Sequence, residues 1–237
     1  MSDVVNNLGN KIIVSVQAEG KEPLNRPEHL LALSNSVISG GAGGLRLCGI
    51  KNISYISKAI DVPILGLTKL DPTPFNYLDS VYITATMKEL KDLLKTKIDF
   101  IAIDGTPRPR ADNSTLKEQI GLIKKEEKIA VCDVSTFEEG VNAAAFGADI
   151  ISTTLSGYTR ETRYKVNEGP DFELLEELIH ELPVPVIMEG RIWEPDDVKH
   201  AFDLGAFAVV IGTAITRPQI ITKRFVSAIP QPKSLSP

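Results

Sequence analysis

The sequence has few residues of the kinds that form disulfides, metal sites or nucleophilic triads. Its 237 residues include two cysteines, three histidines and one tryptophan. Cys48 and Cys132 each lie in a short apolar run, which is typical of reduced core residues. The histidines, His29, His180 and His200, fall in segments expected to form outer helices. Histidine catalysis and a histidine-bound metal are therefore disfavoured, and we expect no metal site.

Long hydrophobic runs and an excess of positive charge are also missing. No apolar segment approaches the length of a membrane span, and no signal peptide is visible, so we expect a cytoplasmic protein with no membrane partner. The net charge of −5 argues weakly against a nucleic-acid partner, but it leaves a small anionic substrate open. The glycines of residues 40–44 follow a helical segment and enter a strand, which is the wrong context for a nucleotide loop. We therefore expect no cofactor.

Short runs rich in valine and isoleucine alternate with longer amphipathic segments along the chain. The runs lack polar alternation, as expected for strands that are covered on both faces. Eight strand-helix units in series predict an α/β protein with a single (β/α)₈ barrel, the TIM barrel. The expected strands are Ile12–Gln17, Gly44–Cys48, Pro63–Lys69, Phe100–Asp104, Ile129–Asp133, Ile150–Thr154, Pro185–Glu189 and Ala208–Gly212. The expected helices include Pro27–Ser39, Thr115–Glu127, Thr136–Phe146, Asp171–Glu181 and Pro195–Leu204.

The barrel is expected to occupy residues 1–229 as one domain. Val81–Thr84 resembles a ninth strand, but it is short and follows a proline-containing stretch, so we assign it to a long loop after the third strand. The proline-rich residues 230–237 are expected to form a disordered tail.

Seven of the eight expected strands carry polar or charged residues at or near their carboxyl ends, although the strands themselves are apolar. In a TIM barrel the carboxyl ends of the strands carry the active site. Charges at these positions are costly unless they are paired or functional, and a ring of structural ion pairs is the alternative explanation. These ends are Gln17, Arg46, Lys69, Asp104, Asp133, Thr153 with Thr154, and Glu189.

Glycines follow the last two expected strands. Gly190 and Arg191 come after the seventh strand, and Gly212 and Thr213 come after the eighth. Phosphate sites in such barrels are commonly built from these two loops, because glycine lets a phosphate approach the backbone N–H groups. We predict a phosphate site of the sugar-phosphate type here.

Lys69 and Glu189 stand nearly opposite each other around the expected barrel. A partly desolvated lysine can act as a base, and a nearby carboxyl group can exchange a proton with a carbonyl oxygen. The pair suits proton abstraction next to a carbonyl. From the residues alone, two alternatives stay open: an imine-forming lyase or synthase that uses Lys69, and a catalytically silent sugar-phosphate-binding barrel.

The motifs KIIVSVQA, GGLRLCGI, PILGLTK, FIAIDGTPRPR, CDVST, ISTTLSGYT, MEGRIWEPDDV and VIGTAITRP resemble those of the N-acetylmannosamine-6-phosphate 2-epimerases, also called N-acylglucosamine-6-phosphate 2-epimerases. The resemblance runs from about Lys11 to Arg217. It implies a cofactor-free epimerase of amino-sugar and sialic-acid catabolism that acts as a homodimer. It also implies that Lys69 removes the C2 proton and that Glu189 assists at the C1 oxygen.

The same resemblance carries over to individual positions. It implies that Gln17, Arg46 and Asp133 line the sugar site, with Asp104 and Arg108 of IDGTPRPR as further substrate-binding residues. It places Gly190, Arg191, Gly212 and Thr213 in the phosphate loops. We add Thr153, at the end of the sixth expected strand, as a substrate-binding candidate. Residues 160–170, after SGYT, are the stretch in which family members are expected to vary.

Overall fold

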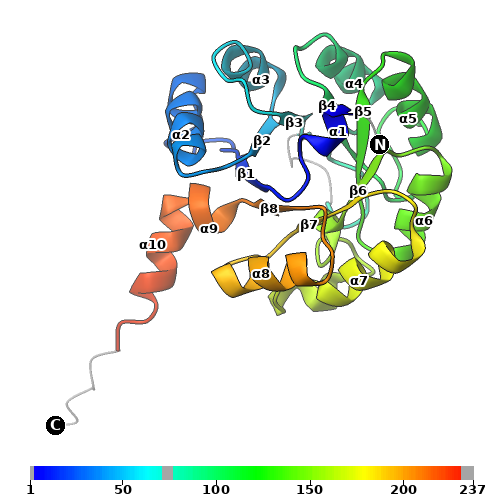
Figure 1. The fold of residues 1–237 in the computed structure, drawn as a ribbon. Coiled ribbons are helices and arrows are strands. Elements are labelled where there is room, and N and C mark those ends of the chain that lie inside the picture. The colour runs from blue at the N-terminus through cyan, green and yellow to red at the C-terminus, as the bar shows by residue number, and fades with distance from the viewer. Residues whose placement is uncertain (1–2, 71–76, 231–237) are drawn as a thin grey trace.

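Eight parallel strands close into a barrel, in the order in which they occur along the chain (Figure 1). The computed structural model describes residues 3–70 and 77–230. Each strand pairs with its neighbours, and β8 pairs with β1 to complete the ring. The predicted (β/α)₈ barrel is confirmed. Its strands are β1 (Ile12–Val16), β2 (Gly44–Cys48), β3 (Ile64–Leu67), β4 (Phe100–Asp104), β5 (Ile129–Asp133), β6 (Ile150–Ser152), β7 (Val186–Glu189) and β8 (Ala208–Ile211).

Helices form the outer layer around the barrel (Figure 1). Three of them begin at a capping box, in which a threonine side chain and the glutamate three residues later satisfy each other's backbone N–H groups: Thr86 with Glu89, Thr115 with Glu118, and Thr136 with Glu139. The predicted bounds differ from the observed ones by at most two residues. The helices between strands are α2 (Pro27–Ser39), α3 (Ile50–Ile56), α4 (Met87–Leu94), α5 (Leu116–Lys125), α6 (Phe137–Ala145), α7 (Phe172–Glu181) and α8 (Pro195–Asp203).

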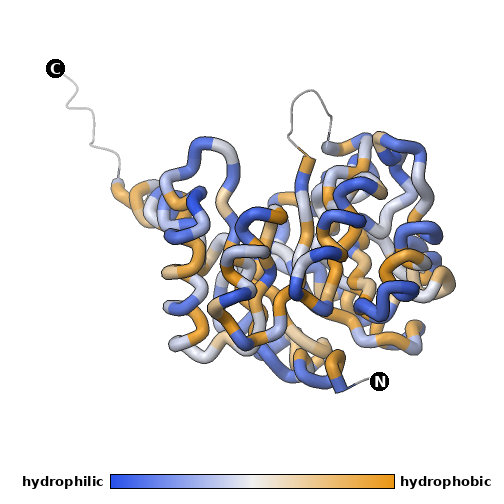
Figure 2. The backbone as a smooth tube through the Cα atoms, turned by 90° about the horizontal axis from the view of Figure 1, so that it is seen from above, coloured by the Kyte–Doolittle hydropathy of each residue, from blue (hydrophilic) through white to orange (hydrophobic). Residues whose placement is uncertain are grey.

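Shorter elements complete the fold. Helix α1 (Asp3–Asn6) packs Val5 against the barrel interior. Two 3₁₀ turns, η1 (Thr153–Leu155) and η2 (Arg163–Asn167), lie between β6 and α7. After β8 the chain forms α9 (Thr213–Thr216) and α10 (Pro218–Val226). Helix α10 lies at the edge of the molecule, and hydrophobic residues gather toward its C-terminal end (Figure 2).

Side chains along each strand alternate between the barrel interior and the outer layer. On β1, Ile13 belongs to the interior cluster, whereas Val14 and Val16 pack with the surrounding helices. The interior is filled by Leu65, Leu67, Phe100, Ala102, Val131, Ile150, Ile187, Ala208 and Val210. On six of the strands the inward-facing series ends in a polar residue at the mouth of the barrel. These residues are Gln17, Lys69, Asp104, Asp133, Thr154 and Glu189. The apolar core therefore gives way to a polar layer at one mouth of the barrel.

The segment after β3 returns to the mouth without forming a ninth strand, as predicted. Within it, Ile83 makes an isolated antiparallel bridge to Lys69. Residues 71–76 of this loop and residues 231–237 of the predicted disordered tail lie outside the described residues. In the part of the chain that the structure describes, no helix is long and apolar enough to cross a membrane.

Candidate active site

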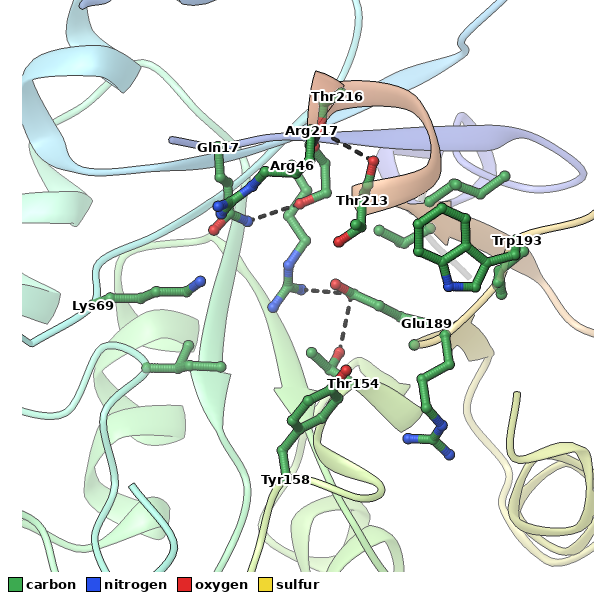
Figure 3. Close-up of a pocket in the computed structure, with 18 of the residues that line it drawn as sticks. Gln17, Arg46, Lys69, Thr154, Tyr158, Glu189, Trp193, Thr213, Thr216 and Arg217 are labelled. Carbon is green, nitrogen blue, oxygen red and sulfur yellow. Dashed lines mark hydrogen bonds and ion pairs between the residues drawn. The ribbon is translucent and has the colours of Figure 1, made fainter. Parts of the chain in front are cut away.

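A cavity of about 450 Å³ opens at the carboxyl ends of the strands (Figure 3). The chain brings eight of the predicted site residues to its wall although they are far apart in sequence. Neighbouring strand ends converge because all eight strands run in the same direction. These eight residues are Gln17, Arg46, Lys69, Glu189, Gly190, Arg191, Gly212 and Thr213.

Arg46 lies at the centre of the charged groups in this site. Its Nη2 atom lies 2.5 Å from Asp133 Oδ2, and its Nη1 atom lies 3.3 Å from Glu189 Oε2. The residue is 1% exposed. Burial lowers the pKa of Arg46, but the carboxylates of Asp133 and Glu189 outweigh that effect and raise it above its usual range. Arg46 is therefore a permanent cation between two carboxyl groups.

Glu189 is the titratable carboxyl group of the cavity. Burial raises its pKa to about 7, although the Arg46 guanidinium opposes this change. Thr154 Oγ1 lies 3.0 Å from Glu189 Oε2 and 2.7 Å from Asp133 Oδ1, so one hydroxyl group bridges the two acids. A carboxyl group with this pKa can both accept and donate a proton near neutral pH.

Lys69 enters the cavity from the opposite side to Glu189, with the Arg46 guanidinium between them (Figure 3). Its Nζ atom lies 2.6 Å from Glu19 Oε1, in the loop after β1. The Lys69 side chain is 28% exposed, and that of Glu19 is 49% exposed. The ammonium group is thus solvent-accessible and paired at the rim of the cavity.

Gln17 supplies an unpaired polar atom. Its Nε2 atom donates a hydrogen bond to Ser15 Oγ at 2.9 Å, but its buried Oε1 atom has no partner within residues 3–70 and 77–230. An unpaired buried acceptor is costly and marks a place for a donor. Gln17 can therefore accept a hydrogen bond from a bound molecule.

The loops after β7 and β8 have the backbone form expected of an anion site. Gly190 and Arg191 have φ angles of 118° and 57°. Among the described residues, no acceptor is found for the backbone N–H groups of Gly190, Arg191, Gly212 and Thr213. A Cβ atom at Gly212 would lie 3.3 Å from Ser15 Cβ, so glycine keeps this wall open. The four amides are available to a ligand.

Four predicted substrate-binding residues do not line this cavity. Asp133 lies beneath it, against Arg46, and Asp104 is fully buried. Arg108 donates to Asp104 Oδ2 at 2.7 Å and to the Tyr77 carbonyl, and its guanidinium lies 5.9 Å from the centre of the Tyr82 ring. The hydroxyl of Thr153 accepts a hydrogen bond from the Glu189 amide at 3.0 Å and faces the backbone of β7.

Several lining residues were not among the predicted sites. Thr154 takes the place predicted for Thr153, because it continues the inward series of Ile150 and Ser152. The alternation of inward-facing and outward-facing side chains along a strand, here called strand parity, identifies Thr154. No comparable signal marks the aromatic lining residues that come from loops, which are Tyr82, Tyr158 and Trp193.

A second cavity of about 880 Å³ adjoins the first and shares Lys69, Tyr82 and Tyr158 with it. The three histidines are exposed on the outer helices, as predicted. Within the described ranges, no cluster of three or more His, Cys, Asp or Glu side chains has the arrangement of a metal site.

Comparisons with known proteins agree with the motifs. Residues 30–231 match a family model described as "Putative N-acetylmannosamine-6-phosphate epimerase". A "Putative N-acetylmannosamine-6-phosphate 2-epimerase" of Clostridioides difficile (strain 630) is 43% identical over 227 residues, which cover 95% of this chain and 99% of the relative. A protein of the same name from Clostridium perfringens (strain SM101 / Type A) is 45% identical over 230 residues, covering 97% of this chain and 100% of the relative.

The chain also resembles a solved structure, the N-acetylmannosamine-6-phosphate 2-epimerase from Clostridium perfringens. The TM-score is 0.89 at 41% sequence identity, and the match covers 96% of this chain and 97% of that one. Sequence and fold therefore point to one group of isomerases.

Proposed function

This chain belongs to the N-acetylmannosamine-6-phosphate 2-epimerase family, and on that premise we propose that it interconverts N-acetylmannosamine 6-phosphate and N-acetylglucosamine 6-phosphate at the cavity in Figure 3. The observation that carries the proposal is the convergence of Lys69 and Glu189 on one cavity, from β3 and β7. An inversion at C2 needs a base for the C2 proton and a donor for the neighbouring oxygen. The two side chains supply these groups without a cofactor.

The proposed reaction is a balanced pair of proton transfers. Ring opening exposes the C1 aldehyde, which makes the C2 proton acidic. Lys69 takes that proton, the C2–H electron pair forms a C1–C2 double bond, and Glu189 gives its proton to the C1 oxygen. Return of a proton to the opposite face of C2, while the enol O–H gives its proton back to Glu189, restores the aldehyde in the epimeric sugar. The pKa of Glu189, about 7, supports its role as a proton donor.

The remaining predicted residues have positions that support binding or positioning roles. Arg46 and the free Oε1 atom of Gln17 face the sugar, and we assign to Thr154 the contact predicted for Thr153. The unpaired amides of the β7 and β8 loops would take the phosphate. Asp133 orients Arg46.

Asp104 and Arg108 act through a loop and not by direct contact with the sugar in this proposal. Arg108 pairs with Asp104 and also holds the Tyr77 carbonyl and the Tyr82 ring. Tyr82 lines the cavity. The pair therefore fixes the return of the chain after β3 to the cavity wall.

The proposal is tested by following N-acetylmannosamine 6-phosphate by proton NMR with the purified chain in D₂O. We expect resonances of N-acetylglucosamine 6-phosphate to appear and the C2 proton signals of both sugars to disappear. Interconversion without deuterium at C2 would contradict proton abstraction. Inactivation by borohydride that requires substrate would instead indicate a lysine imine.

We also propose that the chain forms a homodimer through α10. None of the nine residues of this helix is buried in the described part of a single chain. Phe225 and Val226 are 72% and 55% exposed, and Ile229 just beyond the helix is 64% exposed. Exposed apolar side chains grouped in this way mark an interaction surface, and a second copy of the chain would cover them. Light scattering should give twice the 25.8 kDa of one chain, and Phe225→Glu should lower that mass.

A further inference from the structure

Arg191 carries the most specific set of contacts that the proposed reaction does not explain. Its Nε atom donates to the Gly169 carbonyl at 2.8 Å, and its Nη1 atom donates to the Ser156 carbonyl. Its Nη2 atom lies 3.5 Å from Ser156 Oγ. All three nitrogens of the guanidinium therefore face oxygens of the loop between β6 and α7. A guanidinium engaged in this way is not free to bind a phosphate through its fork.

The two partners of Arg191 lie near the start and the end of the segment 156–169. The side chain thus ties both ends of this segment to the loop that follows β7. The segment contributes Tyr158 and Val166 to the cavity wall. At its far end, Asp171 accepts a hydrogen bond from Ser156 Oγ at 2.5 Å and pairs with Lys165 at 3.0 Å, which brings the same two ends together.

Two residues at this contact, Arg191 and Gly157, have left-handed backbone conformations. Arg191 has a φ of 57°, a left-handed conformation that is uncommon for residues other than glycine. Gly157 has a φ of 84°, and a Cβ atom there would lie 2.6 Å from Arg191 Nη1 and 3.2 Å from Val166 Cα. Gly157 therefore leaves the space that the guanidinium occupies. Backbone strain of this kind persists where the surroundings enforce it, and it is concentrated at functional sites.

We propose that Arg191 is a positioning residue that clasps segment 156–169 over the cavity, and that the phosphate is held by backbone amides and not by the Arg191 side chain. This inference rests on the proposed function for its substrate. The clasp sets the positions of Tyr158 and Val166, and hence the closed shape of the wall next to the β7 loop.

Three variants separate the clasp from a direct phosphate ligand. Arg191→Met removes the clasp and the charge. Arg191→Lys keeps the charge, but a single ammonium group cannot span Ser156 and Gly169. Gly157→Ala keeps Arg191 and displaces its guanidinium. The measurements are hydrogen exchange of segment 156–169 in the full-length protein, inhibition by inorganic phosphate, and kcat/KM with N-acetylmannosamine 6-phosphate.

If the clasp operates, all three variants accelerate exchange in segment 156–169 and lower kcat/KM by about tenfold or more, with the inhibition constant of phosphate changed less than about threefold. The Gly157→Ala/Arg191→Met double variant should be no worse than either single variant, because both remove the same contact. Arg217→Met, a control on the opposite side of the cavity, should leave exchange in the segment unchanged.

The contrary result is equally specific. If Arg191→Met weakens phosphate inhibition by tenfold or more, Arg191→Lys restores it, and exchange in the segment is unaltered, then Arg191 is a phosphate ligand and no clasp exists. The Arg191→Lys comparison decides the question even if Gly157→Ala fails to fold. The exchange and phosphate measurements also remain informative if the wild-type chain shows no epimerase activity, so failure of the proposed function is distinguishable from failure of the clasp.

Discussion

The Nζ atom of Lys69 lies 2.6 Å from Glu19 Oε1, and Glu19 also lies 3.5 Å from Arg217 Nη2. One carboxylate therefore contacts two cations that line the cavity, one just after β3 and the other between α9 and α10. Although burial alone would raise it, the pKa of Glu19 is lowered below its usual range by Lys69 and Arg217. The carboxylate of Glu19 therefore holds Lys69 and Arg217 at the rim of the cavity and competes with a bound sugar for Lys69.

Lys69→Ala should slow epimerisation strongly without unfolding the chain. The side chain is partly exposed at the end of a strand, so its removal leaves the core intact. Loss of one proton-transfer group should lower kcat by about 10²–10⁴-fold. The measurement is deuterium incorporation at C2 in D₂O, with circular dichroism to check folding. Lys88→Ala, at an ammonium that is 89% exposed on α4, is the matched control, and C2 exchange near the wild-type rate in Lys69→Ala would exclude Lys69 as the base.

Glu19→Gln should raise kcat/KM at neutral pH by roughly two- to fivefold. An ion pair as exposed as this one contributes about 0.2–1 kcal/mol, and its loss frees the Lys69 side chain to turn toward the C2 proton. Glu22→Gln is the control, because Glu22 pairs with Arg217 and not with Lys69. Both variants should be assayed from pH 6 to pH 9. A fall in kcat/KM specific to Glu19→Gln would show that Glu19 positions Lys69 and does not restrain it.

The barrel was predictable because its signals are local and repeated. Apolar runs, capping residues and glycines after helices recur in each unit, and closure follows from eight units in series. The polar residues at the mouth were also predictable, since strand parity places Lys69 and Glu189 on the inner face. Parity also identifies Thr154 in place of Thr153, once the end of β6 at Ser152 is known.

Contacts made by loops could not be predicted in this way. Glu19 lies in a loop with no periodicity, and nothing local indicates that it meets Lys69, fifty positions later in the chain. Arg191 was expected to bind phosphate because of its neighbours in sequence. Its side chain, on a left-handed backbone, contacts Ser156 and Gly169, and such a conformation has no signature in residue spacing.

The pH dependence of kcat/KM should have one break, at about pH 7, that belongs to Glu189. The active form holds a proton on Glu189, which it gives to the C1 oxygen. Below the break Glu189 keeps this proton. Above it Glu189 loses the proton, so the profile bends downward relative to its course below the break.

Glu189→Gln should remove this break. Glutamine keeps a hydrogen-bond donor at every pH, so the residual activity of the variant should follow the same trend below and above pH 7. The profiles are measured by initial rates at low substrate concentration. A break that persists at the same pH in Glu189→Gln would assign the titration to another group.

Arg46→Met should destabilise the folded chain by about 3–5 kcal/mol at neutral pH, because it leaves buried carboxyl groups without their cation. The Asp133 side chain is 0% exposed and that of Glu189 is 13% exposed. Arg46 holds the pKa of Glu189 down against the effect of burial, so in the variant that pKa rises further above its value in the unfolded chain. A group with a raised folded pKa stabilises the fold most at low pH and loses that contribution as pH rises through the folded value. The deficit in the free energy of unfolding, measured with urea, should therefore be smaller at pH 5 than at pH 8.

The double variant Arg46→Met/Asp133→Asn, which removes one of the two uncompensated carboxylates, should recover part of the lost free energy of unfolding at pH 8. If the deficit were independent of pH and unaffected by Asp133→Asn, Arg46 would stabilise the barrel by packing and not as the cation shared by the two acids.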